Sequence, residues 1–225
     1  AEKGDEQFWQ PEAFVNNPQE GVDALQKALE MDDVPRVLEA IDIAHLQGGE
    51  MVGSLVCFID GRPFKSGYKR FKIRHGQGNN DYLSIQEVVT RRYREASVGN
   101  EVYPDVIIID GGPAQVHAAL DAFKLMDIKP PMVVSLAKKE ELTYVQARTD
   151  PLTLPRNHLV LKLLQYARDE AHRFAQHYHH ILRRKAQLAE EIAAGRRAPK
   201  RKLRQGAAAP TAPLPSPPTP TDPAP

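Results

Sequence analysis

Apolar positions along residues 37 to about 190 follow two periods, and these periods predict a series of strands and helices. Continuous apolar runs and two-residue alternation indicate strands, whereas apolar residues that recur every three or four positions indicate helices. The expected strands span 37–43, 51–59, 68–73, 106–109 and 132–136, with a hairpin around 142–145. The expected helices span 82–95, 114–125 and 158–188, the last as one helix or two.

The order of these elements predicts an α/β fold. The first three strands are joined by short connections, such as the turn signal at 60–63, and they are therefore expected to be antiparallel. Helical crossovers make the later strands parallel to the sheet. The result is a ribonuclease H-like mixed sheet flanked by helices, in which the first and fourth strands lie side by side at the centre.

Composition divides the chain into three zones. Residues 1–36 are polar except for Val22, Leu25 and Leu29, whose spacing predicts an N-terminal helical extension that ends by Pro35. Residues 37–190 are expected to form the ribonuclease H-like domain. Residues 191–225 are first basic and then rich in Pro and Ala, and they are expected to be disordered because they lack apolar bulk to offset their ordering entropy.

Bulk charge and cysteine content narrow the function only slightly. The formal net charge is +1, from 30 basic and 29 acidic residues, so the net charge does not by itself indicate a nucleic-acid-binding protein. Cys57 is the single cysteine, which excludes an intramolecular disulfide and favours a reducing compartment. The chain shows no membrane-length apolar run and no signal peptide, so a cytoplasmic protein without membrane contact is expected.

Two aspartates occupy positions where a carboxylate is costly. Asp42 lies inside an apolar strand with Ile on both sides, and Asp110 ends the apolar run 106–109, directly before Gly111 and Gly112. A buried carboxylate needs a partner, a hydrogen bond or a metal ion. Because their strands are expected to be neighbours, the two carboxylates could converge on a hard cation such as Mg²⁺ or Mn²⁺. Taken alone, Asp110 is more typical of a turn before two glycines than of a metal ligand.

Two further residues are candidates for the same site, and each also has a simpler structural explanation. His172 borders the apolar side of the last helix and could be a metal ligand or proton carrier, although spacing alone favours a half-buried histidine bonded to a neighbour. Asp81 precedes a helix and is most simply an N-cap or N-terminal charge, with a third acidic metal ligand as the sharper alternative.

Phosphate-binding features are present but not specific. Gly111 and Gly112 follow a strand and open a helix, where backbone N–H groups could meet phosphate, but the segment is not a nucleotide-binding motif. Basic side chains on the third strand and the next helix could track a nucleic-acid backbone, or could simply protect an edge strand. They are Lys65, Lys69, Arg70, Lys72, Arg74, Arg91, Arg92 and Arg94.

Six segments, in order along the chain, resemble the C-terminal nuclease domain of the UvrC family, the incising subunit of bacterial nucleotide excision repair. Residues 41–48 resemble its D-I-S-H-x-x-G segment, and residues 104–112 match P-D-x-I-x-I-D-G-G. Residues 164–175 resemble L-Q-x-x-R-D-E-A-H-R-F-A. Shorter matches lie at 80–82, 90–93 and 135–138. Several motifs in sequence are more specific than any one alone.

The resemblance implies a metal-dependent DNA endonuclease of ribonuclease H-like fold that makes the 5′ incision in damaged double-stranded DNA. It implies a UvrABC-type complex with a UvrB-like partner. The family's Asp–Asp–His centre falls on Asp42, Asp110 and His172, with Mg²⁺ or Mn²⁺ as the metal, and a further acidic residue of the family falls on Asp81.

The sequence also departs from the family pattern. The usual Ser is Ala44, and the usual Lys-Gly is Pro113-Ala114, which removes a cation near the expected site. The family's GIY-YIG nuclease and helix-hairpin-helix modules are not in this sequence. A non-catalytic ribonuclease H-like module that binds nucleic acid or protein is the main alternative. A nuclease that cuts RNA hybrids or junctions is another.

Overall fold

A computed structural model describes residues 17–45, 51–74, 80–96, 102–137 and 142–193. The basic run that begins at Arg196 and the Pro-rich tail lie outside the described residues, as do residues 1–16. The chain divides after Arg184 into two units, and the packing described below belongs to residues 1–184.

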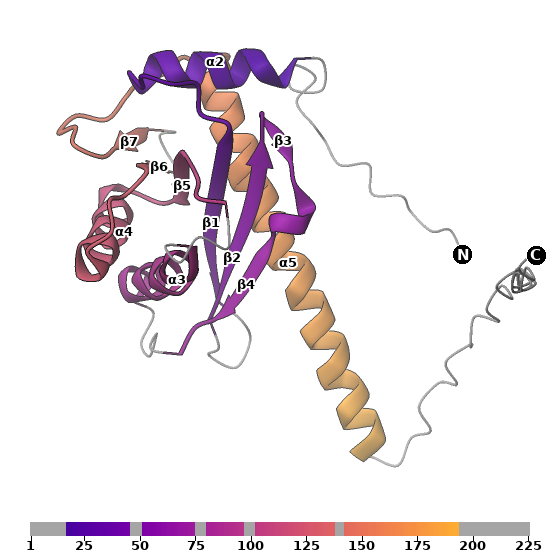
Figure 1. Cartoon of the computed structure of the whole chain (residues 1–225). Coiled ribbons are helices and arrows are strands. Elements are labelled where there is room, and N and C mark those ends of the chain that lie inside the picture. Colours follow the sequence, from indigo (N-terminus) through magenta and orange to yellow (C-terminus); the bar gives the residue numbers. More distant parts are fainter. Residues whose placement is uncertain (1–16, 46–50, 75–79, 97–101, 138–141, 194–225) are drawn as a thin grey trace, which may run out of the picture. The chain divides into compact units, whose positions relative to one another are not determined.

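The described residues form one seven-stranded sheet with helices on both faces (Figure 1). The strands are β1 (Val37–His45), β2 (Met51–Ile59), β3 (Arg62–Pro63), β4 (Lys69–Lys72), β5 (Val106–Asp110), β6 (Met132–Leu136) and β7 (Thr143–Val145). The helices are α2 (Pro18–Ala28), α3 (Asp81–Ala96), α4 (Pro113–Met126) and α5 (Leu159–Ala193), with a 3₁₀ turn, η1 (Lys65–Gly67). None of the described helices is long and apolar enough to cross a membrane.

Strand pairing confirms the predicted topology. The sheet order is β3-β2-β1-β5-β6-β7, with β4 also paired to β2. β1 is antiparallel to β2, and β2 to β4, whereas β1–β5 and β5–β6 are parallel because helices cross over between them. The expected hairpin appears as β7, antiparallel to β6. The α/β, ribonuclease H-like mixed sheet is therefore confirmed, with β1 and β5 adjacent at its centre.

Some element ends differ from the sequence prediction. The first helix ends at Ala28, well before Pro35, because Glu30 adopts a positive φ of 52° that breaks the helix. The last helix is one continuous element of 35 residues rather than two. Proline marks a region that a helix avoids, but it does not fix the last helical residue.

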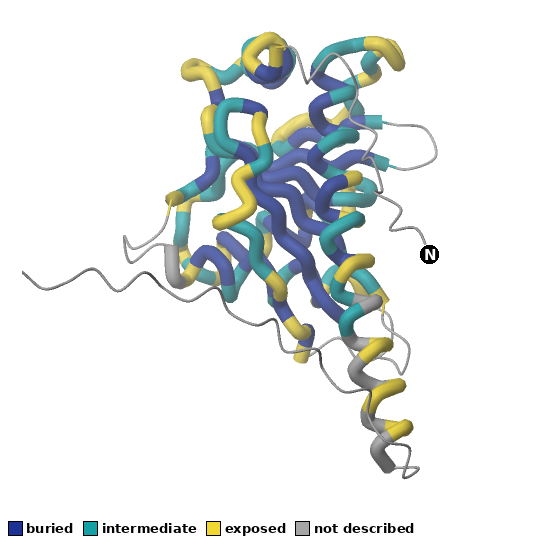
Figure 2. Tube along the Cα trace, turned by 90° about the vertical axis from the view of Figure 1, so that its right-hand side faces the viewer, coloured by how far each residue is buried: buried dark blue, intermediate teal, exposed yellow. Residues whose placement is uncertain are grey.

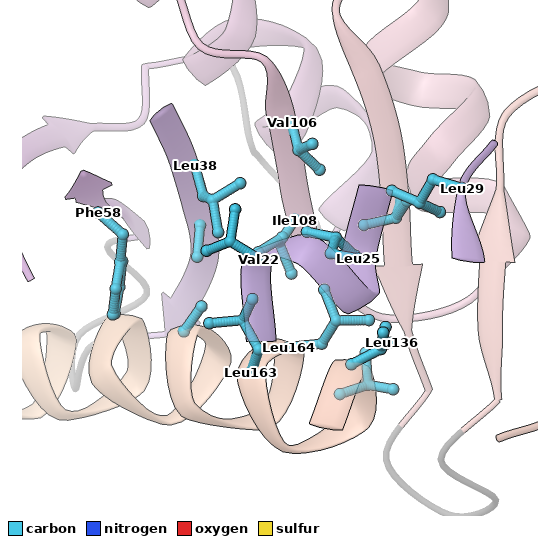
Figure 3. Close-up of a cluster of buried hydrophobic side chains, with 14 of the residues drawn as sticks. Val22, Leu25, Leu29, Leu38, Phe58, Val106, Ile108, Leu136, Leu163 and Leu164 are labelled. Carbon is cyan, nitrogen blue, oxygen red and sulfur yellow. The ribbon is translucent and has the colours of Figure 1, made fainter. Parts of the chain in front are cut away.

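Each face of the sheet carries its own apolar core. One core joins the sheet to α2 and α5, and Figure 3 shows Val22 and Leu25 meeting Leu38, Ile108 and the leucines of α5. The other core joins the sheet to α3 and α4. The central strands are buried throughout much of their length (Figure 2), as expected for strands covered on both faces.

A charged network lies inside the α3 side of the fold. Glu39 of β1 is 2% exposed and accepts hydrogen bonds from Arg92 Nη2 at 2.7 Å and from Tyr93 Oη at 2.5 Å. Arg92 Nη2 also donates to the Val102 carbonyl at 3.0 Å. Burial and the Glu39 charge raise the pKa of Tyr93. Arg92, which the sequence suggested as a phosphate contact, is therefore an internal ion-pair partner of β1.

Candidate active site

Asp42 and Asp110 lie side by side on the two central strands. Ile41 of β1 is in register with Ile109 of β5, so the next residues along these parallel strands are the two aspartates. Leu38 and Val106 belong to the core on the α5 side of the sheet. Asp42 lies four positions after Leu38 on β1, and Asp110 lies four positions after Val106 on β5. Alternation along a strand therefore directs both carboxylates to the face that α5 covers.

His172 reaches Asp42 from α5. Its Nδ1 lies 3.4 Å from Asp42 Oδ2, with the Asp42 side chain 5% exposed and that of His172 51% exposed. The other ring nitrogen, Nε2, lies 2.9 Å from Gln176 Nε2, one turn along the helix. A hydrogen bond at one ring nitrogen fixes the tautomer and the orientation of the ring. The imidazole is thus held with Nδ1 toward the buried carboxylate.

Contacts with the edge of the sheet hold the part of α5 that carries His172 in place. Tyr68 Oη donates to Glu170 Oε1 at 2.8 Å, and Arg173 pairs with the same carboxylate at 2.5 Å. The Tyr68 and Phe174 rings pack edge to face, and the Arg70 guanidinium lies 3.9 Å from the centre of the Phe174 ring. The charged residues that flank His172 therefore anchor the helix that carries it.

A cavity of about 500 Å³ opens at the ends of these strands. Its described lining includes Asp42, His45, Asp81, Asp110 and Gln115, and it includes no Lys or Arg. The cavity thus joins three carboxylates with His45 as the basic side chain among its described lining residues. Asp81 and Asp110, far apart in the sequence, both line it, while their membership of one catalytic site stays a prediction.

The turn after Asp110 is tightly constrained. Gly111 has a φ of +142°, and a Cβ there would lie 2.7 Å from the Gln115 side chain. Its N–H donates to the Leu136 carbonyl, while Gly112 N–H donates to Gln115 Oε1 at 2.9 Å. Both glycine amides are therefore used inside the protein, and the predicted phosphate contact by these amides is wrong for this conformation.

The basic side chains of β4 and α3 divide into two groups. Arg91 donates to the Lys72 carbonyl at 2.8 Å and to Glu87 at 3.0 Å, and Arg92 is buried on Glu39. Both arginines stabilise the fold, and burial of Arg92 removes it from the predicted phosphate track, whereas for Arg91, whose side chain is 35% exposed, that contact stays a prediction. Lys72 and Arg74 are exposed, in agreement with either interpretation of the edge strand.

His45 is the site residue that sequence reasoning missed. It ends β1, three positions after Asp42, and its Nε2 lies 3.2 Å from Asp81 Oδ1. The signal available in the sequence was its place within segment 41–48. Asp81 is not the N-cap of α3, since Asn80 Oδ1 accepts the Leu83 N–H at 3.3 Å and so takes the capping position.

The donor set fits a hard divalent cation. Two carboxylates on adjacent strands repel each other unless a positive charge lies between them, and oxygen ligands suit Mg²⁺ or Mn²⁺. Within the described part of the chain, no three His, Cys, Asp or Glu side chains are close enough to hold one metal ion together. The shared ligand set of Asp42, Asp110 and His172 therefore stays a prediction, supported pairwise by register and by the His172–Asp42 contact.

Comparisons with known proteins point to one family. Residues 26–176 match the family described as the UvrC RNAse H endonuclease domain. The UvrABC system protein C of Moorella thermoacetica is 43% identical over 164 residues, which cover 72% of this chain and 27% of the relative. That of Methanococcus maripaludis is 41% identical over 174 residues, which cover 77% of this chain and 33% of the relative. The chain thus spans about a third or less of the length of these curated relatives.

Solved structures give a weaker likeness. The catalytic domain of human Endonuclease V is 12% identical with a TM-score of 0.39, and the match covers 83% of this chain and 100% of that one. The Endonuclease V of Bacillus subtilis is 12% identical with a TM-score of 0.38, covering 76% of this chain and 94% of that one. The match over residues 26–176, with the identity to the UvrABC relatives, shows that this chain belongs to the family of UvrC RNAse H endonuclease domains.

Proposed function

We propose that this domain is a metal-dependent endonuclease that makes the 5′ incision in damaged double-stranded DNA during nucleotide excision repair. It would act in the cytoplasm, in a UvrABC-type complex with a UvrB-like partner. The observation that carries the proposal is the pair of carboxylates on adjacent central strands, at the mouth of a cavity and beneath His172. The names of the curated relatives supply the repair context.

The residues of the site have distinct parts in this proposal. Asp42 and Asp110 would hold Mg²⁺ or Mn²⁺, with His172 as the third ligand. When bound, the ion polarises the phosphate and lowers the pKa of water, and so supports in-line attack on phosphorus with departure of the 3′ oxygen. Gln176 contacts the His172 ring, and the Tyr68–Glu170–Arg173 contacts hold α5, so both help to keep the imidazole next to Asp42.

Nicking of a supercoiled plasmid tests the proposal. The chain is incubated with Mn²⁺, alone and with purified UvrA and UvrB on ultraviolet-irradiated plasmid, beside an Asp42→Asn variant and an EDTA control. We expect metal-dependent nicking that is lost in the variant. An RNA–DNA hybrid cut in preference to damaged duplex would instead assign the domain to hybrid cleavage. No nicking with the partner proteins present would favour a non-catalytic binding module.

A further inference from the structure

A histidine–aspartate pair lines the cavity on the side away from α5. His45 is the last residue of β1, and Asp81 is the first residue of α3. Their side chains are about half exposed and lie 3.2 Å apart, from His45 Nε2 to Asp81 Oδ1. Both line the same cavity as Asp42 and Asp110.

Strand geometry separates this pair from the proposed metal ligands. His45 follows Asp42 by an odd number of residues, so alternation along β1 directs it to the opposite face, where α3 begins. Three residues of strand span about 10 Å. The cavity of about 500 Å³ therefore has an Asp42–Asp110 side and a His45–Asp81 side.

The Asp81 carboxylate lies in the first turn of α3, where it offsets the positive end of the helix dipole, and it also contacts His45. Asn80 occupies the capping position of α3. The Asp81 carboxylate faces the His45 ring, and a carboxylate at one ring nitrogen of a neutral histidine holds the proton on that nitrogen. The other nitrogen, Nδ1, is then the proton acceptor of the ring.

We propose that His45 is a catalytic residue of the hydrolysis, and that Asp81 is a positioning residue that acts through it rather than a metal ligand. The inference rests on the proposed nuclease function. His45 Nδ1 accepts a proton from the attacking water as the water oxygen bonds to phosphorus. The bond from phosphorus to the 3′ oxygen breaks, and the proton then passes to that oxygen directly or through solvent, leaving a 5′ phosphate and a 3′ hydroxyl.

A double-mutant cycle separates this role from metal binding. The variants are His45→Ala, Asp81→Ala and the pair together, with Asp42→Asn as the ligand control, all assayed for nicking. General-base removal typically costs about 10²- to 10⁴-fold in rate. We expect a loss in this range for His45→Ala, a smaller loss for Asp81→Ala, and little additional loss when both are changed. Losses that multiply in the double variant would overturn the proposal, as would full activity of His45→Ala.

Two further readouts separate the roles, and the first of them does not depend on nicking. Mn²⁺ binding, measured by calorimetry, should be nearly unchanged in Asp81→Ala and weakened in Asp42→Asn; equal weakening would make Asp81 a ligand and refute the inference. Added imidazole should restore nicking to His45→Ala but not to Asp42→Asn, with wild type at the same imidazole concentration as control. Failure of the wild type to nick would refute the nuclease function itself, whereas the Mn²⁺ comparison would still decide the role of Asp81.

Discussion

Two aspartates of this domain lie at positions where an ionised carboxylate is energetically unfavourable. Asp42 is 5% exposed, and Asp110 is its neighbour on the adjacent parallel strand. Burial removes solvation from the Asp42 carboxylate, and a second carboxylate on the adjacent strand adds repulsion, so a cation near both would stabilise the pair. Such positions are retained where the charge has a use, and divalent cation binding is the use that this donor set fits.

The first prediction concerns Asp110→Asn. Nicking should fall by at least about 100-fold, since even residues that only support metal ligands are worth about 10- to 100-fold. In EDTA, the free energy of unfolding should stay equal or rise, because one of two repelling charges is gone. Urea titrations with and without Mn²⁺ measure this, and Mn²⁺ should stabilise the wild type more than the variant.

The matched control for this prediction is Asp127→Asn. Asp127 is exposed at the end of α4 with a φ of 55°, a conformation that asparagine adopts readily. It should leave both nicking and the Mn²⁺ effect unchanged. Wild-type nicking by Asp110→Asn would remove this residue from the site.

The second prediction concerns Cys57, the single cysteine, which is 6% exposed on β2. Burial, with a smaller contribution from the Glu39 charge, raises the pKa of the thiol to about 11. A raised thiol pKa favours the neutral form, so little reactive thiolate exists below that pH. Alkylation by iodoacetamide at pH 8 should therefore be slow in the folded protein and fast in urea. Rapid alkylation without denaturant would contradict the burial of Cys57. Slow alkylation of an active-site variant would in turn show that the variant is folded.

At the scale of elements, the apolar periods located most strands and helices well. The bounds of β2 and β6 agree with prediction, since apolar runs ended by turn residues leave few alternatives. The adjacency of Asp42 and Asp110 followed from topology alone, because parallel strands joined by crossovers bring equivalent ends together.

Contacts between elements that are distant in the sequence could not be predicted from the sequence pattern. Arg92 looks like any other arginine on a helix, and nothing local shows that Glu39 of β1 lies buried beneath it. The pairing of His45 with Asp81 likewise depends on how the end of β1 meets the start of α3. Periodicity indicates which face of an element is buried, but not which polar group on another element meets it.

The third prediction tests this buried network with Glu39→Gln. The substitution leaves the Arg92 charge buried without its carboxylate, and breaking such a pair from one side costs about 3–5 kcal/mol. Urea unfolding should show a loss of this size. Glu30→Gln is the control, because Glu30 pairs with Arg148 at the surface and is 78% exposed, so its loss should be under about 1 kcal/mol. Similar losses in the two variants would refute an internal structural role for Glu39.

At the scale of the whole molecule, the proposed binding of DNA would have to come from a chain with almost no net charge. Arg91 and Arg92 are used within the fold, and no Lys or Arg is among the described residues that line the cavity. The chain also spans only about a third or less of the length of its curated relatives. Within this chain, the densest positive charge is the run between Arg196 and Arg204.

The fourth prediction is that deleting residues 196–225 weakens DNA binding and reduces its salt dependence. The deleted segment carries six basic residues: Arg196, Arg197, Lys200, Arg201, Lys202 and Arg204. For duplex DNA, the slope of log K against log salt should fall by about 0.9 for each phosphate that the shortened protein no longer neutralises. Fluorescence anisotropy across a NaCl series measures the slope, and a chain that lacks only residues 206–225 is the control, since it keeps the basic run. If all three proteins share one slope, the run does not touch the phosphates, and the folded domain alone accounts for the binding.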